Sequence, residues 1–252
     1  MKRTNAKVSS ESAPTSPERE AQAALTWLKR HATKATRDGM ARYGVPSDNA
    51  LGVTMADMKV LAKQLGRNHD LAAALWDIGC YEARMLTSFV DEPALVTPTQ
   101  MDRWCRDFDN WGICDTVCFH LFDRTPHAWT KVAQWNDRDE EFVKRAAFAL
   151  LWGLTVHDKR APDASFAEGL RVIERAATDE RHLVKKAVNM ALRAIGKRNS
   201  ALNAAAVTVA RRLADSPPGA ARWVGKDALR ELTSPGVRGR LAAKRPQGAT
   251  GA

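Results

Sequence analysis

The chain has 252 residues, 44% of them hydrophobic, and lacks any apolar run near the roughly 20 residues that span a bilayer, which excludes a membrane-spanning helix. Four cysteines in apolar surroundings are too few for a disulfide scaffold and fit a reducing cytoplasm. The net charge is +10, and its whole excess lies in residues 131–252, which hold 23 basic and 13 acidic side chains. A one-sided basic surplus is typical of proteins that bind a polyanion, above all nucleic acid.

The change of composition along the chain predicts one folded domain between two tails. Residues 1–20 are rich in serine, proline and charge and predict a disordered N-terminal tail. Residues 21–234 have helical patterning, and residues 235–252 predict a basic, flexible C-terminal tail. Within the domain, Thr97 and Pro98 predict a helix start, Asp109 is a candidate cap for the next helix, and Gly196 fits the end of a helix that begins near Glu180.

The later helices repeat one another. The run Val143–Ala146 recurs as Val184–Ala187 after 41 residues, and Val224–Lys226 follows 40 residues later. This period is the one expected for HEAT-like helical hairpins, which stack into a curved solenoid with a concave face. The sequence therefore predicts an all-α, HEAT-like α-α superhelix whose concave face is basic.

The faces of these helices support a basic groove. In the helix near 180–195, six residues form one apolar arc: Val184, Ala187, Val188, Ala191, Leu192 and Ile195. The other side carries a line of residues that we call the basic stripe: Lys186, Met190, Arg193 and Lys197. Arg145, Phe148 and Trp152 share a side of an earlier helix, and Arg222, Lys226 and Arg230 share a side of a later one. Such a lined surface suits a duplex phosphate backbone, although a solvated polar face would explain any single helix.

The segment 109–121 carries the candidate chemistry. Trp111 and Asp115 are four residues apart, so they share one helix face, away from the apolar arc that contains Ile113, Cys114 and Val117. Taken alone, Trp111 is more often a packing residue and Asp115 more often a cap or ion-pair partner. Cys114, Cys118 and His120 have no matching second pair of metal ligands, so we expect packing cysteines and no metal or cofactor.

Ordered short segments over about residues 37 to 200 resemble the bacterial DNA alkylation repair glycosylases of the AlkD type, which are built from HEAT-like repeats. The matching pieces are Met40–Tyr43, Leu51–Val53, Leu75–Asp77, Trp111 with Asp115, Arg145–Ala147, and Lys186–Ala187 with Leu192–Arg193. The resemblance implies hydrolysis of the N-glycosidic bond of N3- or N7-alkylated purines in double-stranded DNA, without a base-sized pocket. It implies no cofactor. We expect a cytoplasmic, nucleoid-associated monomer that does not bind membranes.

The resemblance also implies residue roles. Asp115 would stabilise the developing sugar cation, Trp111 would lie against the deoxyribose, and Arg145 would hold a flanking phosphate. The expected DNA-binding residues are Tyr43, Trp152, Lys144, Lys185, Lys186, Met190, Arg193, Lys197, Lys226 and Arg230. Met190 stands where the family pattern has a second tryptophan, so catalysis is expected to be weaker, differently selective or absent. Two alternatives therefore stay open, a non-catalytic duplex-binding protein and a protein-binding helical scaffold.

Overall fold

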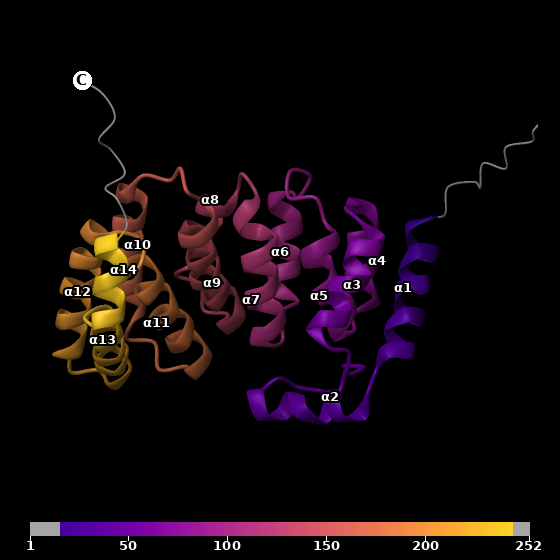
Figure 1. Cartoon of the computed structure of the whole chain (residues 1–252), viewed down its shortest axis with the longest axis horizontal. Helices are drawn as coiled ribbons and strands as arrows, with labels where there is room; N and C mark the ends of the chain where they lie inside the picture. The colour runs from indigo at the N-terminus through magenta and orange to yellow at the C-terminus, as the bar shows by residue number, and fades with distance from the viewer. Residues whose placement is uncertain (1–15, 244–252) are drawn as a thin grey trace, which may run out of the picture.

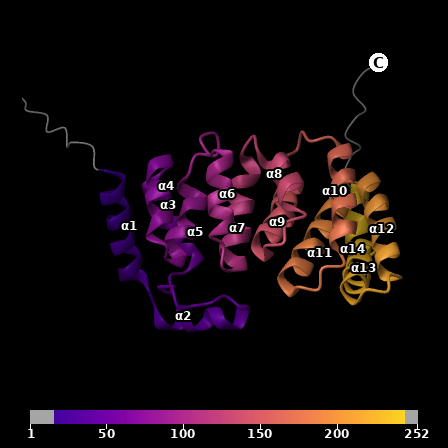
Figure 2. The ribbon, with the colours of Figure 1, turned by 180° about the vertical axis from the view of Figure 1, so that it is seen from behind.

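Helical hairpins stacked in one direction make up the molecule. The computed structural model describes residues 16–243, and within that range it contains fourteen α-helices, two short 3-10 helices and no strand. The stack advances from α1 at one end to α12, α13 and α14 at the other, and Figure 2 shows the same order from behind (Figures 1 and 2). The all-α superhelix expected from the repeat period is confirmed. None of the described helices is long and apolar enough to cross a membrane.

The helices form two rows. Each helix of one row packs against the next, in the order α3 (Met55–Leu65), α5 (Tyr81–Val90), α7 (Trp111–His120), α9 (Glu141–His157), α11 (His182–Gly196) and α13 (Gly219–Leu232). The other row contains α1 (Pro17–His31), α4 (His69–Ile78), α6 (Pro98–Arg106), α8 (Ala128–Trp135), α10 (Asp163–Ala176) and α12 (Ser200–Ala214). The 3-10 helix η2 (Phe122–Arg124) lies between α7 and α8.

The core fills the space between these rows. All six residues of the predicted apolar arc of α11 are fully buried. Trp76 and Trp104 stack in the core with ring centroids 4.2 Å apart, and Trp135 is also buried. Trp27, Trp129 and Trp223 are partly buried and pack against the same core. All four cysteines are free and buried, as a packing role requires.

Local capping decides where the helices begin. Thr97 caps α6, because its hydroxyl accepts a hydrogen bond from the Gln100 amide at 3.1 Å, and Pro98 follows as expected. The prediction for the next helix was wrong by one residue. Asn110, not Asp109, is the cap of α7, and its side-chain oxygen accepts from the Ile113 amide at 3.0 Å. Helix α11 ends at Gly196 as expected.

Both predicted tails contain helix, which corrects the expected boundaries. Helix α1 begins at Pro17, because Ser16 accepts a hydrogen bond from Arg19. Helix α14 (Pro235–Ala243) occupies the first half of the predicted C-terminal tail, and it is held to the fold by the buried side chains of Val237 and Leu241. The rest of both predicted tails, residues 1–15 and 244–252, lies outside the described residues.

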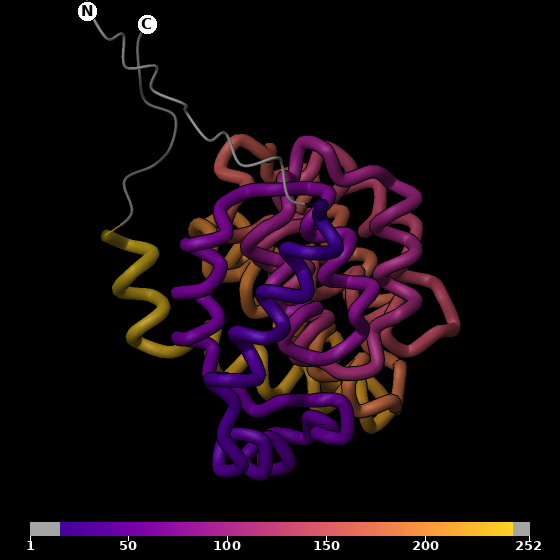
Figure 3. The backbone as a smooth tube through the Cα atoms, turned by 90° about the vertical axis from the view of Figure 1, so that its right-hand side faces the viewer, coloured from indigo at the N-terminus to yellow at the C-terminus, as the bar shows by residue number. Residues whose placement is uncertain are grey.

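A short arm projects from the stack between α1 and α3. It consists of α2 (Lys34–Gly39) and the 3-10 helix η1 (Met40–Tyr43), and it lies below the rows in Figures 1 and 3. The buried Glu82 carboxylate anchors the loop that follows, because it accepts hydrogen bonds from three consecutive amides, those of residues 51–53. Gly52 has a φ of +96°, and a Cβ there would lie 2.3 Å from the Thr33 carbonyl oxygen, so only glycine fits this close approach.

Candidate active site

Asp115 and Arg145 form a bidentate ion pair between α7 and α9. The Arg145 Nε and Nη2 atoms donate to the two carboxylate oxygens at 2.9 and 2.7 Å, and Nη1 donates to the Leu183 carbonyl at 2.6 Å. This fork is the strong geometry for a guanidinium and a carboxylate. The Asp115 side chain is 13% exposed and that of Arg145 only 6% exposed. The arginine therefore positions the carboxylate, and its expected contact with a flanking phosphate stays a prediction.

Burial and pairing act in opposite directions on this carboxyl group. Desolvation raises the pKa of Asp115 above its ordinary value, while the Arg145 charge and its hydrogen bonds oppose that rise. Burial also opposes the protonated form of Arg145, yet the neighbouring carboxylate raises its pKa, so the guanidinium stays charged. The pair is thus an oriented carboxylate held beside a permanent cation.

Trp111 connects the same helix to the arm. It is the first residue of α7, it is partly exposed, and its indole nitrogen donates to the Tyr43 carbonyl at 2.8 Å. Tyr43 itself is 71% exposed at the end of η1. The structure therefore brings Tyr43, Trp111 and Asp115 to one region, although the first is 68 residues away from the second. Nothing in the local sequence around Tyr43 signals this contact.

Two side chains of α9 lie elsewhere than the sequence suggests. Lys144 is mostly buried and forms an ion pair with Asp179 at 3.1 Å, so it does not face the groove as expected. Phe148 is fully buried in the core, although it shares a side with Arg145 and Trp152. Both results follow from the close packing of α9 between α7 and α11, which leaves little of its surface exposed.

Basic side chains of α11 and α13 lie close to one another, with Lys186 exposed and Lys185 half-buried. The ammonium groups of Lys185 and Lys186 lie 5.6 and 4.9 Å from the ring centre of Trp223. Cations at such distances from an indole are attracted by its ring face. Lys226 and Arg222, one turn apart on α13, are also exposed. These four basic side chains form a patch that no acidic residue of α11 interrupts.

Acidic residues of α13 neutralise the other half of the basic stripe. Glu231 accepts from Arg193 at 2.6 Å and from Lys197 at 2.8 Å, and Asp227 pairs with Arg230. These two acids were not among the residues expected beside the basic stripe. The signal was present, because Asp227 and Glu231 are four residues apart on the same helix that carries Lys226 and Arg230.

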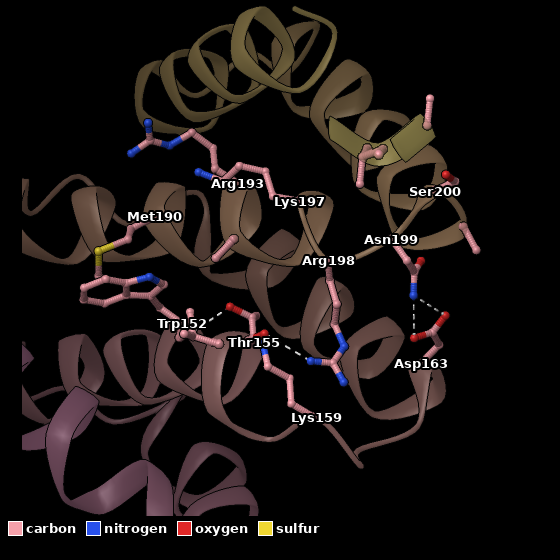
Figure 4. A pocket seen from close by; sticks show the side chains of 15 residues that line it. Trp152, Thr155, Lys159, Asp163, Met190, Arg193, Lys197, Arg198, Asn199 and Ser200 are labelled. Atoms are coloured by element: carbon pink, nitrogen blue, oxygen red, sulfur yellow. Dashed lines mark hydrogen bonds between the residues drawn. The ribbon is translucent and has the colours of Figure 1, made fainter. Parts of the chain in front are cut away.

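Met190 and Trp152 meet in a large cleft next to this stripe. We call it the Trp152 cleft; it has a volume of about 1220 Å³ and lies between α9, α11, the start of α12 and α14. Figure 4 shows the Met190 sulfur directed at the Trp152 indole, with Arg193 and Lys197 along one wall. The residues that line it do not include Trp111 or Asp115, so the cleft is separate from the carboxylate.

A buried cluster of titratable groups lies behind Trp152. Phe119 packs between Trp152 and His157, with ring centroids 4.3 and 4.6 Å away. His157 contacts the buried Asp123 carboxylate, whose pKa burial raises to about 6 although the imidazole opposes the rise. Burial lowers the pKa of His120 to about 4, with smaller contributions from nearby positive charges.

The fold and this geometry define an α-helical repeat protein with an arginine-paired carboxylate and a neighbouring tryptophan on one side of its stack. A family model described as "DNA alkylation repair enzyme" matches residues 24–232. The chain therefore belongs to this DNA alkylation repair family. A comparison with curated proteins found no significant match.

A solved structure is similar over most of the chain. It was described as "A new family of proteins related to the HEAT-like repeat DNA glycosylases with affinity for branched DNA structures". The likeness has a TM-score of 0.71 at 20% identity and covers 89% of this chain and 97% of the other. At this identity the comparison establishes the HEAT-like repeat fold.

Proposed function

We propose that this protein is a DNA glycosylase that hydrolyses the N-glycosidic bond of N3- or N7-alkylated purines in double-stranded DNA. The observation that carries the proposal is the oriented Asp115 carboxylate, fixed by Arg145 and flanked by Trp111, in a chain that belongs to the DNA alkylation repair family. On this proposal the protein acts on DNA in the cytoplasm as a monomer and needs no cofactor.

The chemistry of the substrate explains why one carboxylate is enough. An N3- or N7-alkylated purine already carries a positive charge, so it departs with the bonding electrons without protonation by an acid. The sugar that it leaves is cationic, and an ionised carboxylate stabilises that charge as it develops. Arg145 keeps Asp115 in one orientation, so little reorganisation is needed when the bond breaks. The same carboxylate orients the water that then attacks the sugar.

The neighbouring groups position the substrate. Trp111 presents an aromatic face to the cationic sugar, and its hydrogen bond to the Tyr43 carbonyl holds the indole in place. Lys185, Lys186 and Lys226 supply positive charge for the phosphate backbone. Arg193 and Lys197 are already paired with Glu231, so they contribute less.

Release of N7-methylguanine from methylated duplex DNA by the purified protein tests the proposal. The wild type should release the base, and Asp115→Asn should lower the rate by about a hundredfold or more, as loss of a transition-state charge does. Asp137→Asn is the matched control, because it removes an exposed carboxylate from the loop between α8 and α9. Its rate should equal that of the wild type.

The Asp115→Asn variant must also bind duplex DNA at least as tightly as the wild type, which separates a lost chemical step from a lost fold. Trp111→Ala, at a partly exposed position, gives a second variant that should also slow base release. Normal base release by Asp115→Asn would refute the assigned mechanism.

One observation favours a second function, a DNA-binding relative without catalysis. By the resemblance, Met190 stands where the family pattern has a second tryptophan, and its thioether offers no aromatic face to a cation. That function predicts duplex binding with a steep salt dependence and no released base. A protein-binding scaffold, the third possibility, predicts no affinity for DNA even at low salt.

A further inference from the structure

The Trp152 cleft combines an aromatic floor with a cationic rim. Its floor carries the Trp152 indole, which packs against Phe119 on one side, and the flexible Met190 side chain, which points to the same ring. Four basic residues and one acidic residue are among those that line it. The acid, Asp163, is held by hydrogen bonds from the Asn199 amide at 2.9 and 3.0 Å.

The volume and the lining suit one chemical class of ligand. About 1220 Å³ exceeds the roughly 300–1,000 Å³ typical of small-molecule pockets, so a nucleotide enters with room for its neighbour. A base stacks on an indole irrespective of its identity, and a phosphate is attracted by the exposed Lys159 ammonium group at the rim. Methionine adapts its shape to flat partners, so Met190 adjusts to a base beside Trp152. Arg198 donates to the Thr155 and Ala161 carbonyls, which fixes its guanidinium in the wall of the cleft.

One wall of the cleft belongs to α9, the helix that carries Arg145, although the cleft itself is separate from the Asp115 carboxylate. Trp152 lies seven residues after Arg145 on α9, a rise of about 10 Å, and Phe119 lies one turn after Asp115 on α7. We infer that the Trp152 cleft binds an unpaired nucleotide of DNA, with the base on Trp152 and Met190 and the phosphate near the exposed Lys159. This inference rests on the proposed function, because it assumes that DNA occupies the neighbouring face.

Binding of two DNA molecules by fluorescence anisotropy at one salt concentration tests the inference. One is a fully paired duplex, and the other has the same sequence with a single bulged, unpaired nucleotide. The wild type should bind the bulged DNA about tenfold more tightly, which is within the range that stacking of one base on an aromatic ring provides. The ratio of the two affinities is the quantity to compare between variants.

Trp152→Ala should bring this ratio close to one, and Lys159→Glu, at an exposed position, should lower it. The matched control is Trp27→Ala, because Trp27 stacks on His31 in α1, far from the cleft, and its loss should preserve the wild-type ratio. A 5-iodouracil in the bulge should form a photo-crosslink that peptide mass spectrometry maps to Trp152.

The possible failures are distinguishable. Equal affinity of the wild type for both DNAs, or a crosslink only outside the cleft, would overturn the inference and leave the proposed function standing. Binding of free deoxyadenosine monophosphate without any gain for the bulge would also overturn it, since the ligand would then be a free nucleotide. Absence of binding to either DNA at low salt would refute the proposed function itself.

Discussion

The Asp115–Arg145 pair makes a quantitative prediction about stability and activity together. In Asp115→Asn, the Arg145 guanidinium, whose side chain is only 6% exposed, loses its carboxylate partner. Its hydrogen bond to the Leu183 carbonyl remains. Removing one member of a buried ion pair costs about 3–5 kcal/mol, and we expect the lower end because the Asp115 side chain is 13% exposed. Arg145→Met should cost less, since a carboxyl group without its cation can take up a proton.

A double-mutant cycle isolates the interaction between these side chains. The double variant Asp115→Asn with Arg145→Met should be more stable than the sum of the single losses predicts, by about 2 kcal/mol. Urea unfolding measures the free energy of unfolding of each variant, provided that its slope against urea concentration is the same in all of them. Additivity within about 0.5 kcal/mol would refute the conclusion that Arg145 is what holds Asp115.

The same pair predicts a change in the pH profile of base release. Burial raises the pKa of Asp115 and the Arg145 charge opposes the rise, so Arg145→Met should raise that pKa further. Because the ionised carboxylate is the active form, the acidic limb of the profile should move to higher pH. An unchanged limb would show that the guanidinium does not control this carboxyl group.

Three further predictions concern groups around the site. Gly52→Ala should destabilise the arm by more than about 1 kcal/mol, because of its φ of +96° and the lack of space for a Cβ, and hydrogen exchange in residues 34–50 should rise; unchanged exchange would contradict this. The raised pKa of Asp123, about 6, makes the free energy of unfolding fall as the pH rises from about 4 to 6. The lowered pKa of His120, about 4, makes the free energy of unfolding increase as the pH rises over the same range. Asp123→Asn should therefore leave a more positive slope of the free energy of unfolding against pH, and an identical slope would refute this account. Glu231→Gln should remove the Glu231 carboxylate that pairs with Arg193 and Lys197, so the logarithmic salt dependence of duplex affinity should steepen by about one to two. An unaltered salt dependence would argue that the stripe does not meet phosphate.

Much of the fold was predictable because it depends on short-range patterns. A helix face is set by spacings of three and four residues, so the buried arc of α11 was visible in the sequence, as was the cap at Thr97. The period of about 40 residues indicated stacked hairpins, because each hairpin can bury its apolar face only against a neighbour. The predicted starts of α7 and of the folded domain were wrong by one and four residues, at Asn110 and Pro17. Several polar side chains compete to cap the helix at each place.

The candidate site was less predictable, because its contacts join residues far apart in the chain. Asp115 pairs with Arg145 across 30 residues, and Arg193 pairs with Glu231 across 38. A basic side chain looks the same in the sequence whether it meets solvent or an acid of a neighbouring loop or helix, as Lys144 and Arg193 demonstrate.

The amino-acid sequence by itself determined the helical stack, the basic surplus of its second half and the Trp111–Asp115 face, since each follows from spacing along a single helix or from composition. Only the tertiary structure decided that Arg145 serves Asp115 and that Glu231 neutralises half of the basic stripe. It also placed Met190 against Trp152 in a cleft. The physical reason is that charge pairing and burial depend on which helices become neighbours, and packing alone sets that arrangement.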